Sequence, residues 1–174
     1  MADTAARPGY LADLAVLLAS LNPTEIELAT AILAATAGII YAVGNGGCAA
    51  IASHFAADCP GRVVSLCDGV PNLTRIANDT GYADVFAVQL AERGMDSCDV
   101  LLAMSVSGES ENVLRAATYA DGYGAGTVAF TGNGGGQLAA LARVAVVVPS
   151  GEYELVEDVF GALCHLVARE IKGK

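Results

Sequence analysis

Apolar residues along this chain follow two periodicities that alternate with each other. Short, uninterrupted apolar runs predict five buried strands, at residues 39–43, 62–66, 100–105, 126–131 and 143–148. Between them, apolar residues recur every three to four positions and predict helices, at residues 10–21, 24–36, 48–57, 73–78, 82–93, 110–119, 138–141 and 154–171. Strands that are apolar throughout and alternate with helices are typical of a parallel sheet covered on both faces. We therefore expect an α/β fold, a three-layer α/β/α sandwich around a five-stranded parallel sheet.

The first two predicted helices precede the first strand and carry strong apolar faces. Thr24 and Glu27 form a capping-box pattern at the start of the second helix. The apolar faces suit either contact with a partner subunit or a cover for the sheet. We expect one domain over residues 1–174, with residues 1–37 at an oligomer interface and residues 38–174 forming the α/β core.

Two loops of small residues follow predicted strands and open predicted helices. They are Gly44-Asn45-Gly46-Gly47-Cys48 and Ser105-Val106-Ser107-Gly108-Glu109-Ser110. In a parallel sheet both lie at the carboxyl edge, where ligands bind. Free backbone N–H groups and the helix dipole favour an anion there, and Ser105, Ser107 and Ser110 add hydroxyl donors. The loops predict a site for the phosphate of a small molecule; a capped helix start and a tight turn are the structural alternatives.

Composition narrows the function classes. The 174 residues carry a net charge of -10, which argues against a nucleic-acid partner, because phosphate backbones require a basic patch. The five cysteines are odd in number and show no CxxC spacing, so we interpret them as reduced thiols of a cytoplasmic protein. No apolar run is long enough to span a membrane, and we expect no membrane partner.

The two loops, together with further motifs, resemble the sugar isomerase (SIS) domain and, within that superfamily, the phosphoheptose isomerase group. The further segments are Ser53-His54-Phe55-Ala56-Ala57-Asp58, Ala77-Asn78-Asp79-Thr80-Gly81-Tyr82, Thr131-Gly132 and Val156-Glu157-Asp158. The resemblance implies a flavodoxin-like SIS fold and a homotetramer with sites near the subunit interfaces. It also implies a phosphorylated sugar as ligand and conversion of a ketose 7-phosphate into an aldose 7-phosphate.

Members of this group hold a zinc ion with two residues of the helix after the glycine loop and two of the last helix. His54 matches the first of these, and Asp58 stands where the group has a glutamate. The spacing of four puts both on one helix face, which suits a metal pair, an acid–base pair or a local hydrogen bond. Asp58 is our candidate general base, with help from His54 or His165, and zinc is the possible cofactor.

The last helix departs from the group's pattern. Anchored on Glu157, the resemblance places the group's glutamine on Val156 and its histidine, eight positions later, on Cys164. His165 lies one step further, and one step turns a helical side chain by about 100°. A shift of the helix would restore its direction; an interface or surface histidine is the alternative. Val156 cannot bind a metal.

The remaining candidate residues are expected to contact the ligand. Asn45, Gly46, Gly47 and Cys48 of the first loop are expected substrate contacts, and Cys48 replaces a serine of the group. Either this is a plain replacement, or the helix start lowers the pKa of the thiol and makes it reactive. The resemblance places Asn78 and Asp79 beside the sugar, although such residues also form turns.

Glu109 replaces a neutral residue of the group's phosphate loop. A carboxylate would repel a bound phosphate, so we expect its side chain to point away from the phosphate or to meet a sugar hydroxyl.

Two functions are compatible with these residues. The first is a ketose–aldose isomerase that acts on a heptulose phosphate, or a similar long-chain ketose phosphate, through an enediol. The second is a non-catalytic SIS protein that binds phosphosugars as a regulator or scaffold. The serine loop and His54 favour the enzyme, whereas Val156 and Cys164 favour the regulator.

Overall fold

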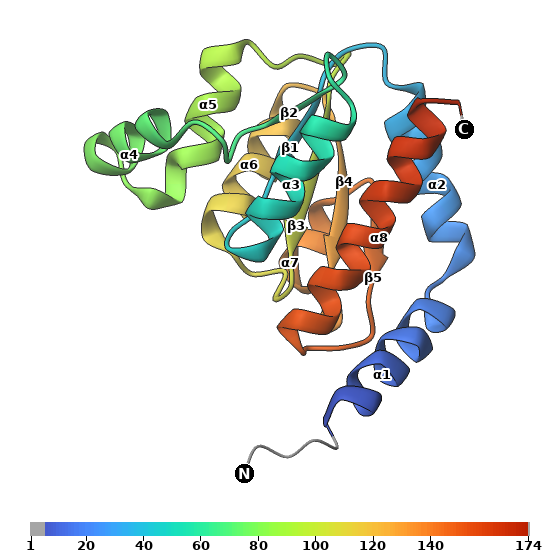
Figure 1. Ribbon diagram of the computed structural model, residues 1–174. Coiled ribbons are helices and arrows are strands. Elements are labelled where there is room, and N and C mark those ends of the chain that lie inside the picture. The colour runs from blue at the N-terminus through green and yellow to red at the C-terminus, as the bar shows by residue number, and fades with distance from the viewer. Residues whose placement is uncertain (1–5, 174) are drawn as a thin grey trace.

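The computed structural model describes residues 6–173 (Figure 1). In chain order its elements are α1 (Ala6–Ser20), α2 (Pro23–Ala35), β1 (Ile40–Val43), α3 (Gly47–Asp58), β2 (Val63–Ser65), α4 (Val70–Asp79), the 3₁₀-helix η1 (Tyr82–Asp84), α5 (Val85–Arg93), β3 (Val100–Ser105), α6 (Glu111–Gly122), β4 (Gly126–Thr131), α7 (Gly136–Leu141), β5 (Val144–Val147) and α8 (Tyr153–Ile171).

The strands form one parallel sheet in the order β2-β1-β3-β4-β5. In register, Ile40 pairs with both Val63 and Val100, and Val100 pairs with Gly126. This is the flavodoxin-like order, in which the direction of winding reverses between β1 and β3. The predicted fold class is confirmed, and both candidate loops follow the two strands at the switch point.

Alternation along the strands divides the core into two layers. Ile40 and Ala42 face a cluster built with α2, α3 and α8, whereas Tyr41 and Val43 face one built with α4, α5, α6 and α7. Figure 1 shows these helices on the two sides of the sheet. Strands buried on both faces require apolar residues at every position, which is why their runs are continuous.

The capping-box interpretation of Thr24 is wrong. Asn22 is the N-cap residue, and its side-chain oxygen accepts a hydrogen bond of 3.0 Å from the Thr24 N–H. Pro23 occupies the first helical position, where its missing N–H costs nothing because that position has no intrahelical acceptor. The helix therefore begins one residue before Thr24.

The N-terminal helices leave apolar side chains on the surface. Leu11, Val16 and Leu28 are each more than half exposed. No single helix within residues 6–173 is long and apolar enough to cross a membrane, although α1 and α2 would qualify by length and composition as a pair bent by 78°. α1 is joined to α8 by a hydrogen bond of 2.8 Å from the Tyr10 hydroxyl to Asp158.

Candidate active site

The three predicted serines form a hydroxyl cluster where β3 ends. Ser105 Oγ donates to Ser110 Oγ at 3.1 Å and lies 3.5 Å from Ser107 Oγ, which accepts from the Glu109 N–H at 3.2 Å. Ser110 is the N-cap residue of α6, yet its side chain makes no capping hydrogen bond to that helix. The serines are therefore not used for capping, and the first turn of α6 keeps donors for an anion.

Glycines hold the serine loop in place. Gly108 has a φ of +68°, and an added Cβ would overlap the carbonyl oxygen of Gly135. The Glu109 carboxylate is held at the start of α7, where it accepts hydrogen bonds from the Gln137 backbone N–H (2.9 Å) and amide (2.6 Å). Both carboxylate oxygens are thus engaged by Gln137, and the two expectations for Glu109 stay predictions.

An amide network fixes the glycine loop. Asn45 and Asn112 exchange two hydrogen bonds of 2.9 Å through their side-chain amides, and the Tyr82 hydroxyl donates to Asn45 Oδ1 at 2.7 Å. Asn112 is buried on α6, so this network joins the β1 loop to the helix that the serine loop opens. Asn112 and Tyr82 were not predicted as site residues, since no spacing in the sequence connects them with Asn45.

A cavity of about 250 Å³ lies under the glycine loop. Its walls are formed by Gly44, Asn45, Gly46, Ala49, Cys67, Leu73, Thr74, Ala77, Tyr82 and Phe86. Asn45 and Gly46 therefore lie at a cavity, as a ligand contact requires. Asn78 and Asp79 are exposed at the end of α4, hydrogen-bonded to each other, and are not among its lining residues.

The start of α3 already faces a carboxylate of the chain itself. Gly47 leaves room for the Glu157 side chain, because a Cβ added at Gly47 would overlap the Glu157 carboxylate. The Cys48 thiol lies 4.0 Å from Glu157 Oε1 and is almost fully buried. Burial, and then the charge of Glu157, raise the pKa of Cys48 to about 12. Burial and a like charge thus argue against the reactive-thiol interpretation of Cys48, because both oppose the effect of the helix dipole.

Three predicted residues from two helices meet on the surface between α3 and α8. His54 Nε2 and His165 Nε2 are 3.0 Å apart, and Asp58 Oδ2 lies 3.6 Å and 3.8 Å from them. A tetrahedral zinc site with bonds of about 2.0–2.1 Å separates its ligands by roughly 3.4 Å. Both imidazoles are more than half exposed, so the cluster is accessible. These three residues therefore fit a divalent metal such as zinc.

The other oxygen of Asp58 faces a cation. Asp58 Oδ1 lies 3.5 Å from the ammonium nitrogen of Lys172, at the end of α8. The carboxylate thus has one oxygen toward the two imidazoles and one toward an ammonium group. Lys172 was not predicted, because nothing in the sequence brings the last turn of α8 to α3.

The structure also corrects the register of α8. Val156 and Cys164, on which the resemblance placed two site positions, are buried in the core with 0% and 2% exposure. Glu157 and His165, which keep the same spacing of eight, line a groove together with Gly47 of α3. His165 therefore reaches His54, whereas Val156 and Cys164 lie in the core, outside this candidate site.

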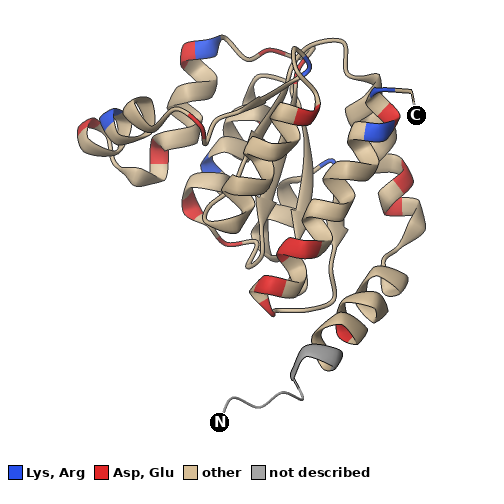
Figure 2. Ribbon diagram, in the orientation of Figure 1, with Lys and Arg blue, Asp and Glu red and all other residues tan. Residues whose placement is uncertain are grey.

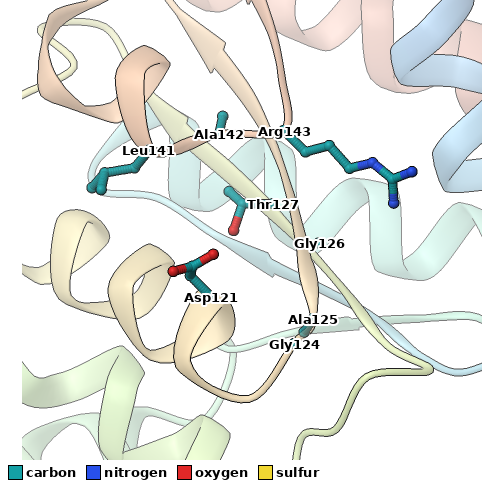
Figure 3. Close-up of a pocket in the computed structure, with 8 residues that line it drawn as sticks. All are labelled: Asp121, Gly124, Ala125, Gly126, Thr127, Leu141, Ala142 and Arg143. Atoms are coloured by element: carbon teal, nitrogen blue, oxygen red, sulfur yellow. The ribbon is translucent and has the colours of Figure 1, made fainter.

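A second cavity, of about 300 Å³, lies at the opposite end of the sheet, where β4 begins (Figure 3). Asp121 and Thr127 point toward each other across it, and Arg143 points away from both (Figure 3). A carboxylate without a facing cation repels phosphate. This cavity is therefore not the predicted anion site.

Charge is sparse around both loops. Figure 2 shows few Lys and Arg on the chain, and neither loop contains one. A phosphate at the serine loop would consequently be bound by hydroxyl and backbone N–H donors, at a helix start, and not by a basic patch.

Comparisons with known proteins agree with this geometry. The family model for the SIS domain matches residues 9–132. A phosphoheptose isomerase of Helicobacter pylori is 37% identical over 139 residues, which cover 75% of this chain and 72% of that protein. The structure of phosphoheptose isomerase GmhA from Neisseria gonorrhoeae has a TM-score of 0.91 at 30% identity, with 98% and 97% of the two chains covered. A phosphoheptose isomerase from Francisella tularensis gives 0.92 at 26% identity, with full coverage of both chains.

Proposed function

Since this chain belongs to the SIS-domain family and to its phosphoheptose isomerase group, it is a sugar-phosphate isomerase, and we propose that it converts a heptulose phosphate into the aldose phosphate through an enediol. The observation that carries this proposal is the convergence of His54, Asp58 and His165. These groups can accept, hold and donate a proton beside an accessible groove. A protein that only bound phosphosugars would need no such cluster.

The serine loop holds the phosphate in this proposal. Ser105, Ser107 and Ser110 supply hydroxyl donors, and the start of α6, which the Ser110 side chain does not cap, supplies backbone N–H groups. The glycine loop lies beside it and offers Asn45 and Gly46 to the sugar hydroxyls. Asn78 and Asp79 remain proposed sugar contacts; they would need a partner subunit or a movement of α4 to reach the ligand.

The length of α3 agrees with a long-chain substrate. His54 is seven residues beyond Gly47, so it lies about 10 Å along the helix from the carboxyl edge of the sheet. An extended heptulose 7-phosphate has eight bonds between C1 and phosphorus and spans roughly 9–10 Å, if three bonds cover about 3.5 Å. A phosphate at the serine loop and a reacting carbon near His54 are therefore compatible with one molecule.

Asp58 moves the proton in the proposed reaction. Its carboxylate takes a proton from C1 of the ketose as the C2 carbonyl oxygen gains one, which yields the enediol. The proton on the carboxyl group exchanges with solvent during the lifetime of the enediol, and the carboxyl group then protonates C2 while the C1 hydroxyl loses its own proton, which yields the aldose. In the metal-free cluster, His165 or His54 exchanges the oxygen-bound protons, and Lys172 holds the ionised carboxylate in place.

Zinc is the proposed metal, held by His54, Asp58 and His165. Zn²⁺ supplies Lewis-acid polarisation of a carbonyl oxygen when bound. The three side chains fit it by donor type and by separation. Glu157, which lines the same groove, is a fourth candidate for contact with the substrate or metal.

The regulator alternative loses its main support. It rested on Val156 and Cys164 at site positions, and both side chains lie in the core. The homotetramer and the cytoplasmic location are part of this proposal; the exposed leucines of α1 and α2 support a subunit interface.

Proton exchange in D₂O tests the proposed function. The chain is incubated with sedoheptulose 7-phosphate, with and without zinc, and deuterium next to the carbonyl is followed by NMR. We expect exchange in the wild type and a loss of 10²- to 10⁴-fold in Asp58→Asn, with Asp121→Asn, at the remote cavity, as the matched control. Binding of the sugar phosphate by the wild type without any exchange would instead establish the regulator.

A further inference from the structure

The aromatic ring of Tyr82 is on the surface, but its hydroxyl is fixed. The residue is 60% exposed, and its hydroxyl donates to Asn45 Oδ1 at 2.7 Å. An exposed tyrosine normally leaves its hydroxyl in water, so this contact with the glycine loop is specific. We propose that Tyr82 is a positioning residue, which acts through Asn45 to hold the glycine loop in its ligand-binding form; this rests on the proposed function.

The network determines which group of Asn45 is available to a ligand. Asn112 Oδ1 accepts from the Val113 N–H at 3.0 Å and from Asn45 Nδ2 at 2.9 Å, which fixes the orientation of both amides. Asn45 Oδ1 then accepts from Asn112 and Tyr82 together. Two donors occupy the side-chain oxygen of Asn45, and in the described part of the chain one of its two amide N–H groups stays free. This N–H can donate a hydrogen bond to a sugar oxygen.

Tyr82 also joins two parts of the chain. It begins η1, which lies between α4 and α5, and Figure 1 shows those two helices standing out beside the sheet. Leu73 and Ala77 of α4 form one wall of the cavity under the glycine loop, and Asn45 forms another. The hydroxyl contact of Tyr82 closes the cavity between these walls. Loss of this contact should loosen the ligand site without touching His54, Asp58 or His165.

Tyr82→Phe removes the hydroxyl and keeps the ring, so it isolates this contact. We expect a roughly three- to tenfold rise in Kd and KM for sedoheptulose 7-phosphate, the range that one hydrogen bond supplies, and a kcat within about twofold of wild type. Its urea midpoint should match the wild type, since the side chain is exposed. Tyr123→Phe is the control, because Tyr123 is 58% exposed and stacks on Tyr119 far from the loops.

A double-mutant cycle tests whether Tyr82 acts through Asn45. In an Asn45→Ala background, Tyr82→Phe should raise Kd no further. Equal Kd values for Tyr82→Phe and Tyr123→Phe would overturn the inference, and so would an undiminished effect in the Asn45→Ala background. A wild type that neither binds nor converts the sugar phosphate overturns the proposed function as well. Calorimetric binding to the wild type therefore separates the two failures.

Discussion

Two neighbouring residues of α8 should give opposite results when each is replaced by alanine. Cys164 is 2% exposed in the core, whereas the His165 side chain is 57% exposed and lies 3.0 Å from His54. If the register of α8 is as the structure has it, Cys164→Ala changes stability and His165→Ala changes catalysis. The sequence-based placement of the site histidine on Cys164 predicts the reverse for activity.

The magnitudes follow from burial. Cys164→Ala removes one buried sulfur and leaves a small cavity, which costs about 1 kcal/mol of unfolding free energy. For a chain of this length, that loss lowers Tm by roughly 2–4 °C. His165→Ala lies on the surface and should change the unfolding free energy by less than about 0.5 kcal/mol. It removes a proton-transfer and metal-binding group, so turnover should fall by about 100-fold or more.

Three assays on both variants test this pair of outcomes. Urea unfolding gives stability, deuterium exchange into sedoheptulose 7-phosphate gives catalysis, and competition with a chelator gives zinc affinity. Cys164→Ala should keep activity within about twofold of wild type, and His165→Ala should lose both zinc affinity and exchange. A stable but inactive Cys164→Ala, or a fully active His165→Ala, would refute the assigned register.

Three other results are expected at the start of α3 and its surroundings. At pH 8 a thiol reagent should label exposed Cys98 and should leave Cys48 unlabelled until urea unfolds the chain. Peptide mass spectrometry measures the labelling of each cysteine, and labelling of Cys48 in the native protein would contradict its burial. Folding raises the pKa of Cys48 from 9.0 to about 12. Its contribution to the unfolding free energy is therefore complete below pH 9 and decreases as the pH rises toward 12. Over that range the unfolding free energy of Cys48→Ser should decrease less steeply with pH than that of the wild type. Gly47→Ala should displace the Glu157 carboxylate and lower turnover, whereas Gly122→Ala, at the end of α6 with open space at its Cβ, should raise the unfolding free energy by about 1 kcal/mol. Equal turnover in the two variants would disprove the Glu157 contact.

The sequence by itself determined the layered α/β fold and the two loops. Short continuous apolar runs such as residues 100–105, set between helical segments, favour strands buried on both faces, and the limits of β3 and β4 were predicted without error. Gly108 and the three serines also identified the loop at the end of β3. These features are local: each depends on the residues of one segment and on the chemistry of one turn.

Contacts between segments distant in the chain were decided only by the tertiary structure. The rotation of α8 about its own axis was not predictable from the sequence, because spacing gives only the relative directions of side chains on one helix. Burial of Val156 and Cys164 against the sheet sets that rotation and turns His165 toward His54. The pKa of Cys48 is another such result, since its sign depends on the neighbouring Glu157 and on exclusion of water, neither of which a helix start reveals.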